Sequence, residues 1–108
     1  MARRGDAEIR EYFRTRPVRW SEHAATAALD DGIGQAEITT ALAKDARVIE
    51  DYPTDWLGAS CLLLAHLEDG RPVHAVIGHA REPWTVITVY LPDPAEWSED
   101  FTERRGQR

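Results

Sequence analysis

The sequence has a single cysteine and no long apolar run, and both features narrow the possible classes of protein. Among its 108 residues only Cys61 is a cysteine, so an intramolecular disulfide is excluded and a reducing compartment is indicated. No apolar stretch reaches about 18 residues, and the N-terminus lacks a charged-then-apolar pattern. We therefore expect neither a membrane span nor a secretory signal, and we predict a cytoplasmic protein.

Metal and cofactor chemistry also lacks its usual signals. The four histidines and the cysteine follow no metal-ligand spacing that we can identify, so we predict no zinc site. No Gly-rich phosphate loop is present, which argues against a small-ligand module and predicts no cofactor.

The charges that are present are distributed unevenly. The net charge is −6, but residues 1–19 carry +3 with six arginines, residues 103–108 carry +2, and the middle of the chain carries −11. Two basic ends that meet in one patch would attract phosphate, whereas the acidic middle suits a basic partner. The alternative is that the terminal arginines are solvated tails, and we favour it for residues 1–5 and 106–108.

The length fits one domain with a single core. Helical signals fill its first half, where Asp6 and Ser21 are the expected N-caps and Pro17 ends the first helix. We expect helices over residues 6–14, 22–30 and 34–44. The last two resemble a helix-turn-helix in outline, but the final helix carries almost no cations, so DNA recognition is not expected. We divide the chain into a basic helix or arm (1–17), one α+β domain (18–105) and a tail (106–108).

Strand signals dominate from residue 46 onward. The continuous apolar run 59–67 is typical of a central strand, and Asp69-Gly70 predicts a tight hairpin turn. Trp97 and Phe101, four apart, predict a short helix over 94–105. We expect strands over residues 46–52, 59–67, 72–79 and 84–91. The predicted fold is α+β, with two to three N-terminal helices on one face of a four-stranded, mainly antiparallel sheet and a short C-terminal helix.

Turn lengths predict which strand residues face each other. A two-residue loop at Asp69-Gly70 would set Ala65 opposite His74. A three-residue loop at 81–83 would set His74 opposite Tyr90. Those two residues and Thr88 would then share an open face of the sheet. The other face would be apolar and covered by the helices, and it would collect Leu62, Leu64, Ala75, Ile77, Ile87 and Val89.

Aromatic and cationic residues follow the last strand. Tyr90 ends that strand, and Trp97, Phe101 and Arg104-Arg105 come after it. A guanidinium offers a planar fork of donors and tyrosine offers a polarisable hydroxyl, so the combination suits a site that handles phosphates. The alternative, in which Tyr90 caps a strand and the arginines form a solvated tail, stays open.

Several short motifs together resemble one bacterial family. They are Ser21–Ala24, Gly32-Ile33, Val48–Pro53, Ser60–Leu64, Asp69–His74, Ile87–Tyr90, Pro92-Asp93, Trp97 and Arg104-Arg105. Over roughly residues 18–105, their order and spacing resemble those of the motifs in the family named domain of unknown function 4258. The resemblance implies a small α+β protein related to RelE/ParE-like and MqsR-like toxins, often encoded beside a zinc-ribbon antitoxin. In toxins of that fold the open sheet face and its rim bind and cut RNA.

The chain departs from that family at two positions. Relatives usually carry an arginine four residues after the first histidine and another just before Gly-Ile, where this chain has Ala27 and Asp31. Either the cations come from elsewhere, or this copy is weakened, inactive, or altered at Ala27 by engineering.

The chemistry of RNA cleavage without a metal assigns roles to particular residues. It needs a base for the 2′-hydroxyl, an acid for the leaving 5′-oxygen and cations on the phosphorane. His74, Tyr90 and Arg104 could fill these roles, and His23 is a second candidate base, although a histidine after an N-cap is more often structural. The expected RNA contacts are Thr88, Arg105 and Arg19. We predict an endoribonuclease toxin that acts on RNA or ribosome-bound mRNA and is neutralised by a cognate antitoxin. The alternative is a catalytically silent, protein-binding relative.

Overall fold

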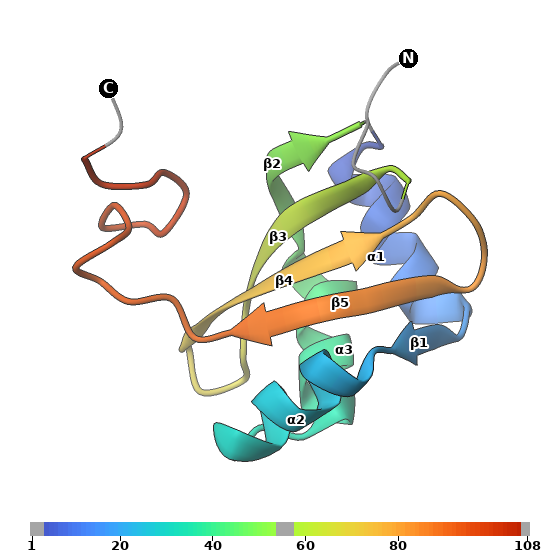
Figure 1. Cartoon of the computed structure of the whole chain (residues 1–108), viewed down its shortest axis with the longest axis horizontal. Coiled ribbons are helices and arrows are strands. Elements are labelled where there is room, and N and C mark those ends of the chain that lie inside the picture. Colours follow the sequence, from blue (N-terminus) through green and yellow to red (C-terminus); the bar gives the residue numbers. More distant parts are fainter. Residues whose placement is uncertain (1–3, 54–57, 107–108) are drawn as a thin grey trace.

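The computed structural model describes residues 4–53 and 58–106. Within these residues it contains three helices and five strands, and the α+β class is confirmed (Figure 1). In chain order the elements are α1 (Asp6–Thr15), β1 (Val18–Trp20), α2 (Glu22–Asp30), α3 (Gln35–Asp45), β2 (Arg47–Tyr52), β3 (Ser60–His66), β4 (Pro72–Gly78) and β5 (Trp84–Tyr90).

The strands form one sheet in the order β1-β5-β4-β3-β2. The four predicted strands are present and pair antiparallel with their neighbours. The fifth strand, β1, corrects the prediction of four strands, since it pairs parallel with β5 through Val18 and Trp84 and through Trp20 and Val86. Its three residues directly after Pro17 are too few to give a clear alternating pattern.

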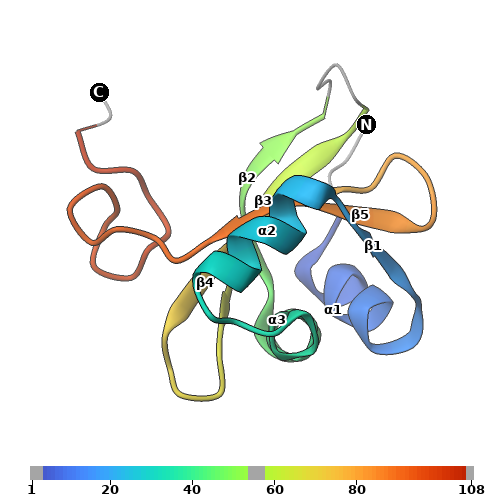
Figure 2. The same ribbon diagram turned by 60° about the horizontal axis from the view of Figure 1, so that its bottom comes forward.

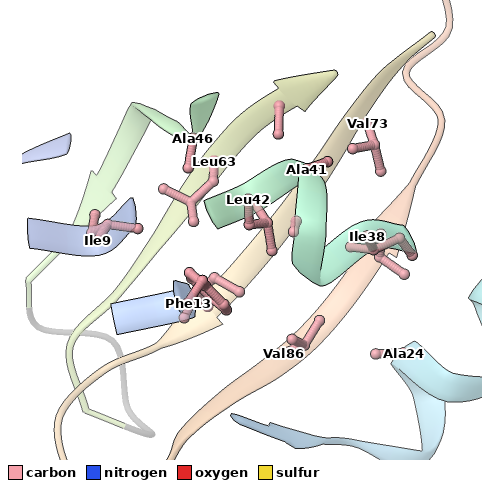
Figure 3. Close-up of a cluster of buried hydrophobic side chains, with 14 of the residues drawn as sticks. Ile9, Phe13, Ala24, Ile38, Ala41, Leu42, Ala46, Leu63, Val73 and Val86 are labelled. Atoms are coloured by element: carbon pink, nitrogen blue, oxygen red, sulfur yellow. The ribbon is translucent and has the colours of Figure 1, made fainter. Parts of the chain in front are cut away.

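The helices pack on one face of the sheet, which we call the first face (Figures 1 and 2). Figure 3 shows the core between the layers, where Phe13 of α1, Ala24 of α2 and Leu42 of α3 lie among buried side chains of the strands. The opposite, second face carries no helix among the described residues. Tyr12 stacks flat on Trp84, with ring centroids 3.8 Å apart, so α1 belongs to this core.

The helix starts agree with the sequence signals in one case and differ in another. The Ser21 hydroxyl accepts a hydrogen bond from the Ala24 amide at 3.0 Å, so the predicted N-cap of α2 is confirmed. The N-cap of α1 is Gly5 rather than Asp6. The Asp6 carboxylate instead accepts a hydrogen bond from the Val48 amide at 2.9 Å, and it thereby ties α1 to the edge strand β2.

The predicted pairing of β3 with β4 is wrong by one residue. His74 lies opposite Leu64, not Ala65. The reason is the turn, which uses three residues: the Gly70 amide donates to the Leu67 carbonyl at 2.8 Å, and Gly70 has a φ of 93°. This is the geometry of a three-residue hairpin loop with glycine in the left-handed position. Leu62 and Leu64 therefore lie on the second face with His74, not under the helices.

The predicted pairing of β4 with β5 is confirmed at two positions, although the register next to the turn differs from the prediction. His74 lies opposite Tyr90, and Val76 lies opposite Thr88. Next to the turn, however, Gly78 pairs with Thr85, one residue away from the predicted register. A β-bulge in β5, between Val86 and Thr88, adds one residue to that strand. The extra residue restores the predicted register at Val76 and His74.

The predicted C-terminal helix is absent from the described residues. Residues 92–106, which we call the C-terminal segment, form turns with a single β-bridge between Trp97 and Arg104 (Figure 1). Short polar side chains such as serine can accept hydrogen bonds from nearby backbone amides, and these bonds compete with the backbone hydrogen bonds of a helix. Ser98 accepts from the amides of Thr102 and Glu103, and Phe101 has a φ of 64°.

Candidate functional site

The candidate site lies on the second face of the sheet, around His74 of β4. The imidazole is 0% exposed, although the sequence predicted an open face. Its Nδ1 lies 3.1 Å from the Tyr90 hydroxyl, and its Nε2 lies 2.9 Å from the Phe101 carbonyl oxygen. The Trp97 ring stands edge-on to it, with centroids 4.3 Å apart. The C-terminal segment therefore covers the predicted site.

The partners of His74 define its protonation. A carbonyl oxygen only accepts, so Nε2 carries a proton and donates it to Phe101. Burial lowers the pKa of His74 below its ordinary value, which favours the neutral ring. In that tautomer Nδ1 accepts from the Tyr90 hydroxyl, and burial raises the pKa of Tyr90, which keeps its proton in place. We call this arrangement the His74–Tyr90 pair.

Arg104 closes the site from the side of β2. Its Nε and a terminal nitrogen donate to the two carboxylate oxygens of Glu50 at 2.7 and 3.0 Å. Its guanidinium also lies over the Trp97 ring, 4.7 Å from the centroid. The Glu50 carboxylate accepts a further hydrogen bond from Tyr52. We predicted that the positive charge of Arg104 would stabilise a phosphorane. In the structure this charge is instead paired with the Glu50 carboxylate.

The pKa shifts in this group follow from those contacts. The Arg104 guanidinium lowers the pKa of Glu50 below its usual range. Burial, followed by the hydrogen bond to Glu50, raises the pKa of Tyr52 to about 12. Each of the three groups therefore stays in its ordinary ionisation state near neutral pH, with one cation, one anion and one neutral hydroxyl.

The structure brings together three of the four predicted catalytic residues, His74, Tyr90 and Arg104. Thr88 lies on the same face, half-buried and opposite Val76. The fourth, His23, is exposed on α2, a helix that packs on the first face, so it does not join the other three.

The remaining predicted RNA contacts lie outside this group. Arg105 is exposed, and its Nε donates to the Pro94 carbonyl within the C-terminal segment. Arg19 lies on β1, next to Thr85 of β5, near the other end of the face. The two positions where the family resemblance led us to expect cations are also elsewhere. Ala27 lies on α2 and packs against the core, and Asp31 is the C-cap of α2.

Sequence reasoning missed the partners of the site. Glu50 and Tyr52 are two apart in β2, a spacing that puts both side chains on one face of a strand. Such a spacing was visible, but it did not indicate that Arg104 would be their partner. The role of the Phe101 carbonyl has no side-chain signal at all.

The fold and the site define a small α+β protein with a buried polar pair on the second face of its sheet. A family model described as domain of unknown function (DUF4258) matches residues 20–91, and the chain belongs to this family. The matched region contains His74 and Tyr90 and ends before Trp97 and Arg104. No curated protein and no solved structure matched the chain.

Two further features are absent from the described residues. None of their helices is long and apolar enough to cross a membrane. Nor do their His, Cys, Asp and Glu side chains form a group of three that could hold a metal ion.

Proposed function

We propose that this protein is the endoribonuclease toxin of a bacterial toxin-antitoxin pair, and that the C-terminal segment holds its site closed. The observation that carries the proposal is the 3.1 Å contact between His74 Nδ1 and the Tyr90 hydroxyl. Cleavage of RNA through its 2′-hydroxyl needs a proton acceptor and a proton donor within reach of the same phosphate. A neutral imidazole and a protonated phenol on adjacent strands supply both.

The closed state explains why the site needs a conformational step. Both ring nitrogens of His74 already have partners, and the charge of Arg104 is matched by Glu50. RNA can reach the pair only after the Phe101 carbonyl and the Trp97 ring move away. When they do, Nε2 of His74 loses its partner, and the guanidinium of Arg104 becomes available once Glu50 is displaced.

The proposed partners follow from the charge distribution. The −11 balance of residues 20–102 favours a cognate antitoxin with an exposed basic surface, including one of the zinc-ribbon type. Such an antitoxin would bind an edge or the helix-free face of the sheet, in the cytoplasm. Gel filtration of the two proteins mixed at micromolar concentration tests this, and two separate peaks would count against it.

A second candidate function is a catalytically silent, protein-binding member of the family. It is favoured by the complete pairing of the site, in which each polar group of His74, Tyr90 and Arg104 named above has a partner. In this case the pair would stabilise the attachment of the C-terminal segment and transfer no protons.

A cleavage assay with one loosened variant distinguishes the two functions. Fluorescent single-stranded RNA would be incubated with the whole chain and with Glu50→Gln, which removes the attraction that holds Arg104. Glu99→Gln, which removes the same charge at an exposed position of the C-terminal segment, is the matched control. We expect slow cleavage by the wild type, faster cleavage by Glu50→Gln and no change for the control. If RNA stays intact with all three proteins, the silent function replaces the nuclease.

A further inference from the structure

The second face of the sheet has an end toward β1 that no other described segment covers, which we call the uncovered end. There a cleft of about 270 Å³ is bordered by β1, by the ends of β4 and β5 and by the loop that joins those two strands. Residues that line it include Arg19, Arg81, Pro83, Thr85 and Ile87. Gly78 also lines it and lies four residues from His74 on β4, so the cleft and the His74–Tyr90 pair share one sheet face.

The shape of the cleft depends on a missing side chain. A Cβ atom added at Gly78 would lie 3.2 Å from Cδ1 of Ile87, so a larger residue there would push into the floor of the cleft. Ile87 is the residue at the bulge of β5, because Val86 pairs with Ile77 and Thr88 pairs with Val76. The bulge and the glycine together hollow this part of the face.

The cationic groups of the cleft are available to a ligand. Arg19 and Arg81 are exposed, and neither makes an ion pair or a side-chain hydrogen bond with another described residue. One carboxylate, that of Glu82, also lines the cleft, but it lies 2.5 Å from the guanidinium of Arg16. Two unpaired guanidinium groups beside a neutralised carboxylate give a local positive potential on a protein whose net charge is −6.

The lining identifies the chemical class of ligand. Guanidinium groups present planar forks of donors that match phosphate oxygens, and the Thr85 hydroxyl can add a further hydrogen bond. The apolar walls offered by Pro83 and Ile87 suit a ribose or the face of a base, and none of the described residues that line the cleft has an aromatic ring for stacking. Such a site recognises a backbone rather than a base sequence. Its volume is slightly below the usual range of about 300 to 1,000 Å³ for small-molecule sites.

We propose that the Arg19–Arg81 cleft binds the phosphodiester backbone of single-stranded RNA and anchors it on the face that leads to the His74–Tyr90 pair. The choice of RNA rests on the proposed function, whereas the anion site rests on the arginines alone. From Thr85 to Tyr90 the strand advances by roughly 16 Å, so the anchored strand would span several nucleotides before it reaches the pair.

The test measures binding without cleavage. The probe is a fluorescent single-stranded oligonucleotide in which every 2′-hydroxyl is methylated, so that it cannot be cut through that group. Fluorescence anisotropy would compare the whole chain with the double variant Arg19→Gln/Arg81→Gln. The control, Lys44→Gln/Arg47→Gln, removes the same charge from exposed residues on α3 and the distant edge strand β2.

The expected result is a loss of affinity of about tenfold or more for the cleft variant and less than about threefold for the control. The slope of log K against log salt should fall by about 1.4 for the cleft variant, since each phosphate contact to a single strand contributes about 0.7. Arg19→Lys/Arg81→Lys should keep most of the salt slope, because the charge remains.

Two outcomes would overturn the proposal: unchanged affinity of the cleft variant, or an equal loss in the control. The outcome also separates this site from the proposed nuclease. Binding that depends on the arginines, without cleavage of ordinary RNA by any variant, would keep the cleft and remove the nuclease. Cleavage of ordinary RNA that does not depend on Arg19 and Arg81 would keep the nuclease and remove the cleft as its RNA anchor.

Discussion

The two ends of the second sheet face differ in how their charges are partnered. At the covered end, Arg104 is held by Glu50, and both nitrogens of His74 have hydrogen-bond partners. At the uncovered end, Arg19 and Arg81 have no carboxylate partner among the described residues. A matched set of charges favours one closed conformation, whereas unmatched cations favour an external anion. If the proposed function holds, the covered end controls access to the His74–Tyr90 pair and the uncovered end binds the RNA backbone.

The largest expected effect concerns catalysis at the covered end. Tyr90→Phe removes the proton donor while it keeps the ring, so RNA cleavage should fall by roughly 10²- to 10⁴-fold, the usual contribution of a proton-transfer group. Initial rates on labelled RNA measure it in the Glu50→Gln background. Because His74 Nδ1 then loses its buried partner, the free energy of unfolding should also fall, by about 1 to 3 kcal/mol.

Urea unfolding of the same variants shows whether the loss of rate is chemical. Thr40→Val removes a hydroxyl from an exposed position on α3, away from both ends of the second face, and serves as the control. An equal loss of rate in Thr40→Val, or full activity in Tyr90→Phe, would contradict the role of the pair.

The next effect concerns the closure itself. Glu50→Gln removes an ion pair that is only partly shielded from water, so we discount its strength to about 1 kcal/mol. That corresponds to roughly a fivefold increase in the open population and in the cleavage rate. Limited proteolysis at Arg104 and Arg105 provides a second measurement, since an opened segment is cut faster. No change in either rate would mean that Arg104 does not hold the segment closed.

A smaller effect is expected from pH. Burial lowers the pKa of His74 in the folded protein below its ordinary value of 6.5, so below about pH 6.5 the unfolded chain binds more protons than the folded one. This contribution to stability is complete above that pH and decreases as the pH is lowered. Glu50 and Arg104, the charged groups nearest the ring, act in opposite directions on the pKa of His74. The melting temperature should therefore fall between pH 6.5 and 5.

His79 is also buried with a lowered pKa, so the pH measurement needs a control. The His79→Gln variant should keep the His74 part of the decrease, and His74→Gln should keep the His79 part. The carboxylates with lowered pKa values, Glu50, Asp69 and Asp100, lose their contribution only at more acidic pH. A flat profile above pH 5 in the wild type would contradict the assignment of a neutral, buried His74.

The smallest effect is expected for Thr88, which lies between the two ends of the second face. Thr88→Val keeps the shape of a half-buried side chain and removes one hydroxyl, which is worth about 0.5 to 1.5 kcal/mol in a hydrogen bond. Affinity for the methylated oligonucleotide should fall by only a few fold, by less than for the arginine pair. A loss larger than that of the arginine variant would place the main RNA contact in the middle of the face.

The sequence predicted the helices and the longer strands, which have regular residue patterns, better than it predicted the turns and the irregular segments. The three helices, their packing on one face and the four longer strands follow from periodicity and caps such as Ser21. The pair between His74 and Tyr90 was also predicted, although the bulge at Ile87 compensated for an incorrect turn. Three features could not be read from periodicity: the three-residue turn at Gly70, the short strand β1 and the irregular C-terminal segment. Each depends on local hydrogen bonds or on pairing with a distant strand.

One of these missed features, the C-terminal segment, also decides the accessibility of the site. Whether His74 is open or covered depends on the backbone carbonyl of Phe101 and on the ring of Trp97, neither of which has a spacing that points to His74. Patterns of residue type can place a side chain on a face. They do not show which irregular segment will cover that face.

The short parallel strand β1 has a practical consequence for work on relatives of this protein. The family match begins at residue 20, yet β1 covers the backbone edge of β5, and the Tyr12 hydroxyl accepts from the Trp84 amide and donates to the Pro17 carbonyl. A protein trimmed to the matched region would leave that edge unpaired and remove the aromatic stack on Trp84. Unpaired edges invite sheets from neighbouring molecules. Insolubility of such a trimmed relative would therefore reflect a lost border of the sheet rather than a property of the intact protein.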